Sequence, residues 1–417
     1  MGLSEKVIGL TSYAVGNSDY KELSRKSPKD FTRNRKMPFE ELVLLMLMSF
    51  KCTAQSALRS FFKDLGHKIS MKQQSFSEAR YKIKVVAFVF LFQLTVKAMV
   101  PECCLTWHSY RVLAIDGSKV NLPADAALLA HFGGNGRGAK SPQAQGSICY
   151  DVLNDIVVDV DIAPLSCDER TVAIAHIDNY QGLFPDEKKL VIFDRGYPSF
   201  ELIDKLEGSS ISYVMRVKKK FNKDIDAQTK PDGYVWLEKG GKRIHIRVIK
   251  FALDSGEEEV LITNITDRSL GKNAFKKLYF MRWPVETKYD IVKNKLQLEN
   301  FTSRTVEGIE QDFFATMYLV NVVAAIKHDA QAEIDAERED KSNKHTCKAN
   351  TNELIGVLKD RFIMAFTEDD PAKQVEIIHK IVTEVSKSII PNREDRSVPR
   401  NPNPRAVKYH HNRKSNC

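Results

Sequence analysis

The sequence lacks the motifs that several large classes of enzyme require. Its seven cysteines include no CxxC pair, and its His and Cys residues do not have the spacing of a zinc site. It has no GxSxG elbow and no Cys/His signature that would indicate covalent catalysis. The stretch HFGGNGRGAKSPQAQG comes near to a phosphate loop, but Ala139 stands where that loop needs lysine. The sequence therefore does not predict a zinc site, covalent catalysis or a phosphate loop.

Signals for secretion or membrane insertion are also missing. An odd number of cysteines in a chain of 417 residues argues against a disulfide framework and favours a reduced cytosol. The start, Met1-Gly-Leu-Ser-Glu-Lys, has neither the charged nor the apolar region of a signal peptide. The most apolar run, 85–100, is interrupted by Gln93 and Lys97 and is too short to span a bilayer. We therefore expect a cytoplasmic protein without a membrane partner, in which this run is a buried helix.

What the sequence does have is positive charge and a sizeable apolar fraction. Hydrophobic residues make up 43% and charged residues 28%, which is typical of a soluble globular protein. The length allows two or three domains. A net charge of +9 and a pI near 9.0 favour a polyanionic partner, either nucleic acid or an acidic membrane surface.

The N-terminal quarter has the pattern of a small helical domain. Apolar spacing predicts helices over 38–50, 53–65 and 71–84, and the third carries basic and amide side chains that include Lys72 and Arg80. A helix, a short glycine turn and a polar, basic helix give the outline of a helix-turn-helix reader of DNA. A plain helical hairpin is the alternative, and only the second half of the chain favours DNA binding over it.

Two acidic residues end apolar strands in the middle of the chain. RVLAID ends at Asp116 and KKLVIFD ends at Asp194, with a predicted hairpin and a helix between them. Three antiparallel strands, a helix and a parallel strand is the order of ribonuclease H, in which strands one and four are neighbours. Burying a bare carboxylate is costly, so two such strand ends side by side predict a metal site.

A third acid lies in the stretch 279–293. At about 100° per residue, Arg282, Glu286 and Lys293 fall on one side of a helix, with Tyr279 a turn earlier. The acid would hold a divalent metal while the cations and the phenol contact phosphate oxygens. Pro284 suits the first turn of a helix, which would place Glu286 in that turn and the two residues before it ahead of a break. The alternative is a surface helix with an ordinary i,i+4 ion pair.

Together, Asp116, Asp194 and Glu286 predict a site for two divalent ions. Magnesium suits these hard oxygen ligands, because it leaves room for water and phosphate, and manganese is an alternative. In a two-metal site, one ion activates the attacking oxygen and the other stabilises the leaving oxygen. The attacking group would be water or a DNA 3′-hydroxyl.

The predicted fold class is α/β, with a ribonuclease H-like core that carries a β-rich insertion between helical regions. The basic strand of that insertion would lie either on DNA or at a solvated sheet edge. The predicted divisions are a flexible arm (1–35), a helical DNA-binding domain (36–105), a catalytic domain (106–330, insertion about 219–268), a helical region with a possible role in dimerisation (331–390) and a basic disordered tail (391–417).

These residues resemble one family. Tyr279-x2-Arg282-x3-Glu286-x6-Lys293 is similar to the Y-R-E-K signature of bacterial insertion-sequence DDE transposases. The surroundings are similar too, in Ile115-Asp116-Gly117-Ser118, Tyr150-Asp151-Val152 and Asp194-Arg-Gly-Tyr197, and the likeness covers roughly residues 110–325. The segment KQQSFSEARYKI, which includes Lys72 and Arg80, also looks like the DNA-binding part of that group.

The resemblance implies a specific activity. Asp116, Asp194 and Glu286 would be the catalytic triad, and Tyr279, Arg282 and Lys293 would contact phosphates at the transposon end. Family behaviour implies recognition of terminal inverted repeats, cleavage through a hairpin intermediate and joining to target DNA by a synaptic homodimer. The protein would be located in the bacterial cytoplasm, in association with the nucleoid. Two alternatives stay open, a ribonuclease H-like nuclease that does not join strands and a non-catalytic DNA-binding derivative.

Overall fold

The structure, a computed structural model, describes residues 1–33, 36–48, 53–66, 71–136, 140–253, 256–338 and 346–391. Contacts divide the chain into two units. The helical unit comprises Met1–Glu102, Asn121–Pro142 and Ile291–Cys417, and the sheet unit comprises Cys103–Val120 and Gln143–Asp290. The predicted basic tail lies outside the described residues except for Pro391. The boundaries predicted for the five divisions of the chain stay predictions.

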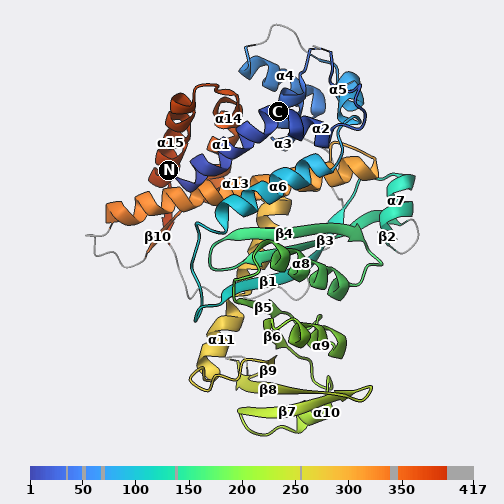
Figure 1. Ribbon diagram of the computed structural model, residues 1–417, viewed down its shortest axis with the longest axis vertical. Helices are drawn as coiled ribbons and strands as arrows, with labels where there is room; N and C mark the ends of the chain where they lie inside the picture. The colour runs from blue at the N-terminus through green and yellow to red at the C-terminus, as the bar shows by residue number, and fades with distance from the viewer. Residues whose placement is uncertain are drawn as a thin grey trace. The chain divides into compact units, whose positions relative to one another are not determined.

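The helical unit is built around one long helix, α13 (Val306–Arg338), which packs along α1 and α6 (Figure 1). Its other elements are α1 (Leu3–Gly16), α2 (Ser18–Ser24), α3 (Phe39–Leu47), α4 (Ala54–Asp64), α5 (Gln73–Arg80), α6 (Val86–Met99), α7 (Ala126–Phe132), β2 (Gly134–Asn135), η1 (Ile291–Lys295), β10 (Cys347–Ala349), α14 (Thr351–Thr367), α15 (Pro371–Lys387) and β11 (Ile389–Pro391). The predicted helices of the N-terminal quarter are therefore present, and the third ends at Arg80.

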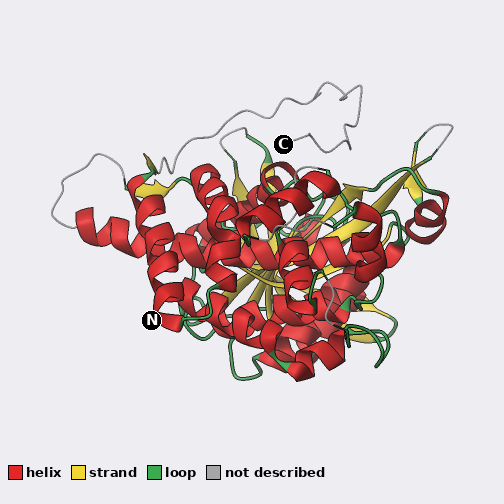
Figure 2. Ribbon diagram, turned by 90° about the horizontal axis from the view of Figure 1, so that it is seen from above, coloured by secondary structure: helices red, strands yellow, loops and turns green. Residues whose placement is uncertain are grey.

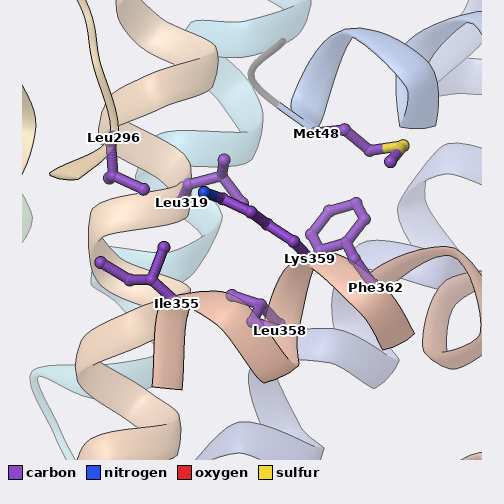
Figure 3. A pocket seen from close by; sticks show the side chains of 7 residues that line it. All are labelled: Met48, Leu296, Leu319, Ile355, Leu358, Lys359 and Phe362. Carbon is purple, nitrogen blue, oxygen red and sulfur yellow. The ribbon is translucent and has the colours of Figure 1, made fainter. Parts of the chain in front are cut away.

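Helix α13 is a core helix. By length and composition alone it is apolar enough to cross a membrane, but 83% of its apolar window is buried inside the protein. Phe313 and Tyr318 are among the largest side chains that are fully buried. Beside it, Leu319 lines a mostly apolar pocket together with Met48 and Phe362 (Figure 3). The predicted apolar helix over 313–326 is thus the central part of a longer one.

The N-terminal segment is folded, where the sequence predicted a flexible arm. Helices α1 and α2 occupy most of it, and Leu3, Val7 and Ile8 of α1 are buried. The start of α1 is held by Asp329 of α13, whose carboxylate accepts hydrogen bonds from the backbone N–H of Leu3 (2.9 Å) and of Ser4 (2.8 Å). The many charges of this segment made it look exposed in the sequence. Its helix α1 nevertheless has an apolar face, which is covered by a helix far away in the sequence.

The sheet unit is a mixed sheet with helices, and its strands form one continuous hydrogen-bonded sheet. Figure 2 draws the strands in yellow and the helices in red. Its elements are β1 (Arg111–Asn121), β3 (Ser141–Asp151), β4 (Ile156–Pro164), α8 (Glu169–Leu183), β5 (Lys189–Phe193), α9 (Phe200–Gly208), β6 (Ser212–Arg216), α10 (Lys223–Ala227), β7 (Asp232–Lys239), β8 (Lys242–Ala252), β9 (Glu258–Thr263), α11 (Lys272–Phe280) and α12 (Trp283–Asp290). Hydrogen bonds join the strands in the order β4-β3-β1-β5-β6-β9-β8-β7, and β2 pairs with the start of β3.

Strands β1 and β5 are parallel neighbours, as predicted, with Val112 opposite Leu190. Strand β1, however, does not end at Asp116 but continues to Asn121. It extends beyond its pairing with β5 and is hydrogen-bonded to β3 on its other side. Asp116 therefore lies within a strand, whereas Asp194 directly follows one, as predicted.

The predicted β insertion continues the main sheet. Strand β9 pairs antiparallel with β6, and β8 lies between β9 and β7. Gly240 and Gly241 form the predicted hairpin turn, and their φ values of 57° and 77° are ones that glycine adopts without strain. Of the two alternatives for the basic strand, the position at a sheet edge is wrong, because β8 has a partner on each side, and the contact with DNA stays a prediction. Arg247 of β8 is buried and pairs with Asp232 at 2.6 Å.

Helix α11 packs on this sheet through an apolar face. Phe275 and Leu278 are fully buried against a cluster that includes Val112 of β1 and Leu190 of β5. Tyr279, in the last turn of α11, belongs to the same cluster. Packing on the two acid-bearing strands therefore fixes where this tyrosine lies.

The cap on α1 gives a test of the folded N-terminal segment. We expect Asp329→Ala to lower the free energy of unfolding by about 1–2 kcal/mol, because it leaves N–H groups at the start of α1 without an acceptor. Chemical denaturation would measure the change. Asp335→Ala, at an exposed position of the same helix, is the matched control. Equal stability of the two variants would contradict the capping role.

Candidate active site

The parallel pairing of β1 and β5 brings Asp116 and Asp194 to the same region of the sheet. Both side chains are partly buried. Burial raises the pKa of Asp116 to about 6, and the negative charges of Glu286 and Asp194 add to this effect, while the positive charge of Arg282 opposes it. The charges of Glu286 and Asp194 thus act on Asp116.

Asp194 has a different environment from Asp116. Burial by itself raises the pKa of its carboxyl, but the backbone N–H of Arg195, the charge of Arg282 and the hydroxyl of Tyr279 together hold that pKa below its usual value. The hydroxyl of Tyr279 donates to the Asp194 carboxylate at 3.2 Å. One acid of the pair is therefore stabilised as a carboxylate and the other is not.

The third acid, Glu286, lies in the first turn of α12, as Pro284 predicted. The helix is interrupted between α11, which ends at Phe280, and α12, which begins at Trp283. The four residues of the Y-R-E-K pattern therefore do not share one helical face. Arg282, in the break, forms an ion pair with Glu286 at 2.8 Å and is 6% exposed. The predicted i,i+4 ion pair between Arg282 and Glu286 is therefore present. The carboxylates of Asp116 and Asp194 also act on this arginine.

Arg282 is the cation of this cluster. Burial alone lowers the pKa of its guanidinium, but Tyr279, Asp194, Glu286 and Asp116 together hold that pKa above its usual value. Its Nε is buried and has no hydrogen-bond partner within the described ranges. A buried unpaired donor is costly, so this N–H is available to an acceptor such as a phosphate oxygen.

Two residues that the sequence did not single out anchor α12. Tyr289 donates to the backbone carbonyl oxygens of Asp116 (2.7 Å) and Gly146 (3.2 Å). The buried Lys288 pairs with Asp155, in the turn between β3 and β4, at 2.5 Å. These contacts tie the helix that carries Glu286 to β1 and β3. No sequence signal identified them, because their partners are distant in the chain.

The three acids offer the type of donor atom that a hard divalent cation prefers, since all their donor atoms are carboxylate oxygens. Among the described residues, no group of three or more His, Cys, Asp or Glu side chains is gathered closely enough to hold a metal ion. Arg282 instead engages Glu286. Magnesium sites commonly use one or two carboxylates and complete their coordination with water and phosphate, so this donor set remains suitable.

Lys293 lies in η1 and belongs to the helical unit. Its amine is 3.9 Å from the carboxylate of Glu299. Burial lowers the pKa of Lys293, against the opposing effect of Glu299. The structure does not place this residue relative to the acids of the sheet unit, so its predicted phosphate contact stays a prediction.

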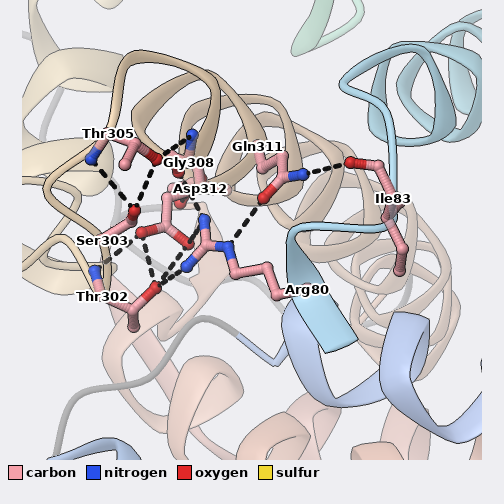
Figure 4. Close-up of polar contacts among 9 residues, drawn as sticks. Arg80, Ile83, Thr302, Ser303, Thr305, Gly308, Gln311 and Asp312 are labelled. Carbon is pink, nitrogen blue, oxygen red and sulfur yellow. Dashed lines mark hydrogen bonds and ion pairs between the residues drawn. The ribbon is translucent and has the colours of Figure 1, made fainter. Parts of the chain in front are cut away.

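The two predicted DNA contacts of the N-terminal quarter lie in different environments. Lys72 precedes α5 and is exposed, whereas Arg80 is 5% exposed. The guanidinium of Arg80 donates to Gln311 (2.7 Å) and Asp312 (3.0 Å), and also to the Thr302 hydroxyl and the Gly308 carbonyl (Figure 4). Arg80 thus joins α5 to the start of α13, and its donors are engaged within the helical unit.

Comparison with known proteins gives one family. The family model of the transposase DDE domain matches residues 107–322, which include the three acids and the residues of the Y-R-E-K pattern. Among solved structures, a piggyBac transposase synaptic complex with hairpin DNA, determined by cryo-electron microscopy, is similar over 95% of this chain and 86% of that chain. The sequence identity is 10% and the TM-score is 0.47. No curated protein matches the chain.

The electrostatics of Asp116 give a pH-dependent prediction for the metal-free protein. A carboxyl whose pKa rises on folding destabilises the folded state above that pKa and not below its unfolded value. We expect Asp116→Asn to raise the free energy of unfolding by roughly 1–3 kcal/mol at pH 8, with the gain disappearing towards pH 4. Urea denaturation in a chelating buffer at both pH values would measure it, with Asp178→Asn as an exposed control. A gain independent of pH would contradict the stated cause.

Arg80 and Lys72 are expected to respond differently to alanine substitution. Arg80→Ala removes one partner of a buried ion pair, so the free energy of unfolding should fall by about 3 kcal/mol or more. Lys72→Ala should leave stability within about 0.5 kcal/mol, because its side chain is exposed. It should weaken binding to duplex DNA and reduce the salt dependence. An Arg80→Ala protein of full stability but poor DNA binding would restore the contact predicted from sequence.

Proposed function

The chain belongs to the transposase DDE-domain family and is a DDE transposase, and from this premise we propose that it excises an insertion sequence and joins it to target DNA. The observation that carries the proposal is the parallel pairing of β1 with β5, beside which the charges of Glu286 and Asp194 act on Asp116. The proposal includes the narrower Y-R-E-K group, an origin in a bacterial insertion sequence and a location in the cytoplasm with the nucleoid.

We propose that the core is of the ribonuclease H type. The strand order β4-β3-β1-β5-β6, antiparallel at β3–β4 and parallel from β1 to β6, supports this assignment. Helix α8 follows β4 and precedes β5, as that order requires. The three further strands extend the sheet beyond β6 and lie between the second and third acids in the chain.

In the proposed reaction, Asp116, Asp194 and Glu286 hold two divalent ions, with magnesium as the natural ion and manganese as a substitute. DDE transposases generally use divalent metals, which supply Lewis-acid activation of the attacking oxygen and stabilisation of the leaving oxygen when bound. Tyr279 orients the Asp194 carboxylate through its hydroxyl. Tyr289 and Lys288 hold α12 so that Glu286 stays beside the two aspartates.

Arg282 has two roles in this proposal. Without metal, its guanidinium offsets the charge of Glu286. With the carboxylates engaged, its donors contact the phosphate at the cleavage site, and the unpaired Nε supports that role. Tyr279 and Lys293 are proposed to contact phosphates at the same DNA end.

The DNA partners are proposed to be the terminal inverted repeats of the element and a target duplex. In cleavage, water attacks the phosphodiester at the element's end, whose P–O bond breaks to release a 3′-hydroxyl. In joining, that 3′-hydroxyl attacks a phosphodiester of the target and displaces a 3′-oxygen of the target strand. A hairpin intermediate and a homodimer that holds both ends belong to the same proposal. The net charge of +9 supports binding to a polyanion.

Removing either of two acids tests the mechanism. We expect Glu286→Gln and Asp194→Asn to abolish magnesium-dependent cleavage of DNA that carries the terminal repeats, because each removes a charged oxygen ligand. Binding to the same DNA should change little. Gel assays of cleavage and of binding at matched salt would measure both. Glu201→Gln, which alters an exposed carboxylate on α9 paired with Lys239, is the control.

Normal cleavage by Glu286→Gln or Asp194→Asn would remove that residue from the site. A joining assay with a target plasmid separates the proposed function from its alternatives. Cleaved ends that never join would favour a nuclease, and DNA binding without either step would favour a non-catalytic protein.

A further inference from the structure

A fourth carboxylate lies close to the backbone that follows each aspartate of the sheet. Glu169 opens α8, and one of its oxygens is 3.3 Å from the position that a Cβ atom on Gly117 would occupy. Its other oxygen is 4.0 Å from the corresponding position on Gly196. Gly117 follows Asp116 directly, and Gly196 is two residues after Asp194. The carboxylate of Glu169 thus reaches the backbone next to each acid.

The cap of α8 does not explain this position. Asp168 is the N-cap, and its side chain accepts from the backbone N–H of Arg170 at 3.3 Å. The Glu169 carboxylate accepts a hydrogen bond from the side-chain amide of Gln145, at 3.2 Å. Glu169 itself is exposed, so its carboxylate is open to a ligand from solvent.

A buried hydroxyl without a partner lies close enough to these acids for their charges to act on it. Tyr197 is 3% exposed, and its hydroxyl has no hydrogen-bond partner in the part of the chain that the structure describes. Burial raises the pKa of its phenol, and the negative charges of Asp116, Glu169 and Asp194 raise it further. Leaving a buried hydroxyl unsatisfied is costly, so its presence here points to an acceptor bound among these carboxylates.

Hydrogen bonds join helix α8, which carries Glu169, to the loop after β5, which carries Tyr197. The guanidinium of Arg170, in the first turn of α8, donates to the backbone carbonyl of Tyr197 at 3.0 Å and to that of Gly196 at 3.4 Å. The position of Glu169 relative to Tyr197 is therefore set by a neighbouring side chain. Such preorganisation is what a binding site requires.

We propose that Glu169 is a fourth carboxylate of the acidic site, directed at a divalent cation, and that the Tyr197 hydroxyl donates to a water held there. The inference rests on the proposed function, because it assigns further residues to the same site. Mg²⁺ retains several of its waters when it binds protein carboxylates. A water of this kind offers the acceptor that the buried phenol lacks, and its own hydrogens find acceptors in the surrounding carboxylates.

Binding of Mn²⁺ alone to the full chain, measured by calorimetry and by electron paramagnetic resonance, tests the inference without DNA or activity. We expect Glu169→Gln to weaken Mn²⁺ affinity about tenfold or more, and Tyr197→Phe to weaken it severalfold. Asp178→Asn, an exposed acid of the same helix paired with Lys205, should match the unaltered protein. Asp116→Asn serves as the reference for loss of a main ligand.

The outcomes separate the inference from the proposed function. Weak Mn²⁺ binding by Asp116→Asn together with unchanged binding by Glu169→Gln would overturn only the fourth carboxylate. Unchanged binding by both variants would remove the acidic site itself. Tyr197→Phe should also fold as stably as the unaltered protein without metal while showing a smaller Mn²⁺-induced rise in Tm. An equal rise would show that the hydroxyl plays no part.

Discussion

Backbone hydrogen bonds between two parallel strands hold like charges together in this protein. The pairing of β1 with β5 fixes Asp116 and Asp194 in one region, although burial and mutual repulsion raise the pKa of Asp116 to about 6. That repulsion costs free energy, and the fully buried apolar pairs beneath it, such as Val112 and Leu190, supply the rigidity that keeps it in place. Functional sites commonly retain such unfavourable arrangements when the surrounding structure determines them.

The counter-charge to these acids comes from one buried arginine. Arg282 pairs with Glu286 and acts on both aspartates, so it lowers the cost of gathering three carboxylates in the absence of metal. A divalent cation would compete for the same carboxylates and release the guanidinium, whose planar donors suit phosphate. Under the proposed function, the same side chain would meet two requirements in sequence, first as the partner of Glu286 and then as a donor to phosphate.

Local signals made the strands, the hairpins and the helix break predictable from the sequence. Apolar runs that end in an acid predicted β1 and β5, and Pro284 predicted that Glu286 opens a helix. What the sequence could not give were contacts whose partners are remote. Arg80 meets Gln311 across 231 residues, and Leu3 meets Asp329 across 326. A basic residue on a polar helix and a charged N-terminal segment look exposed until the distant acceptor is known.

Two phenols show how the third acid is placed by the strands that carry the first two. Tyr279 of α11 donates to the carboxylate of Asp194, and Tyr289 of α12 donates to the backbone carbonyl of Asp116. Each helix is thus attached to one acid-bearing segment, and Glu286 lies between the two attachment points in the chain. Because β1 and β5 are themselves paired, a change in their register would move all three acids and not one alone. The precision of the site therefore resides in the sheet, and the helices transmit it.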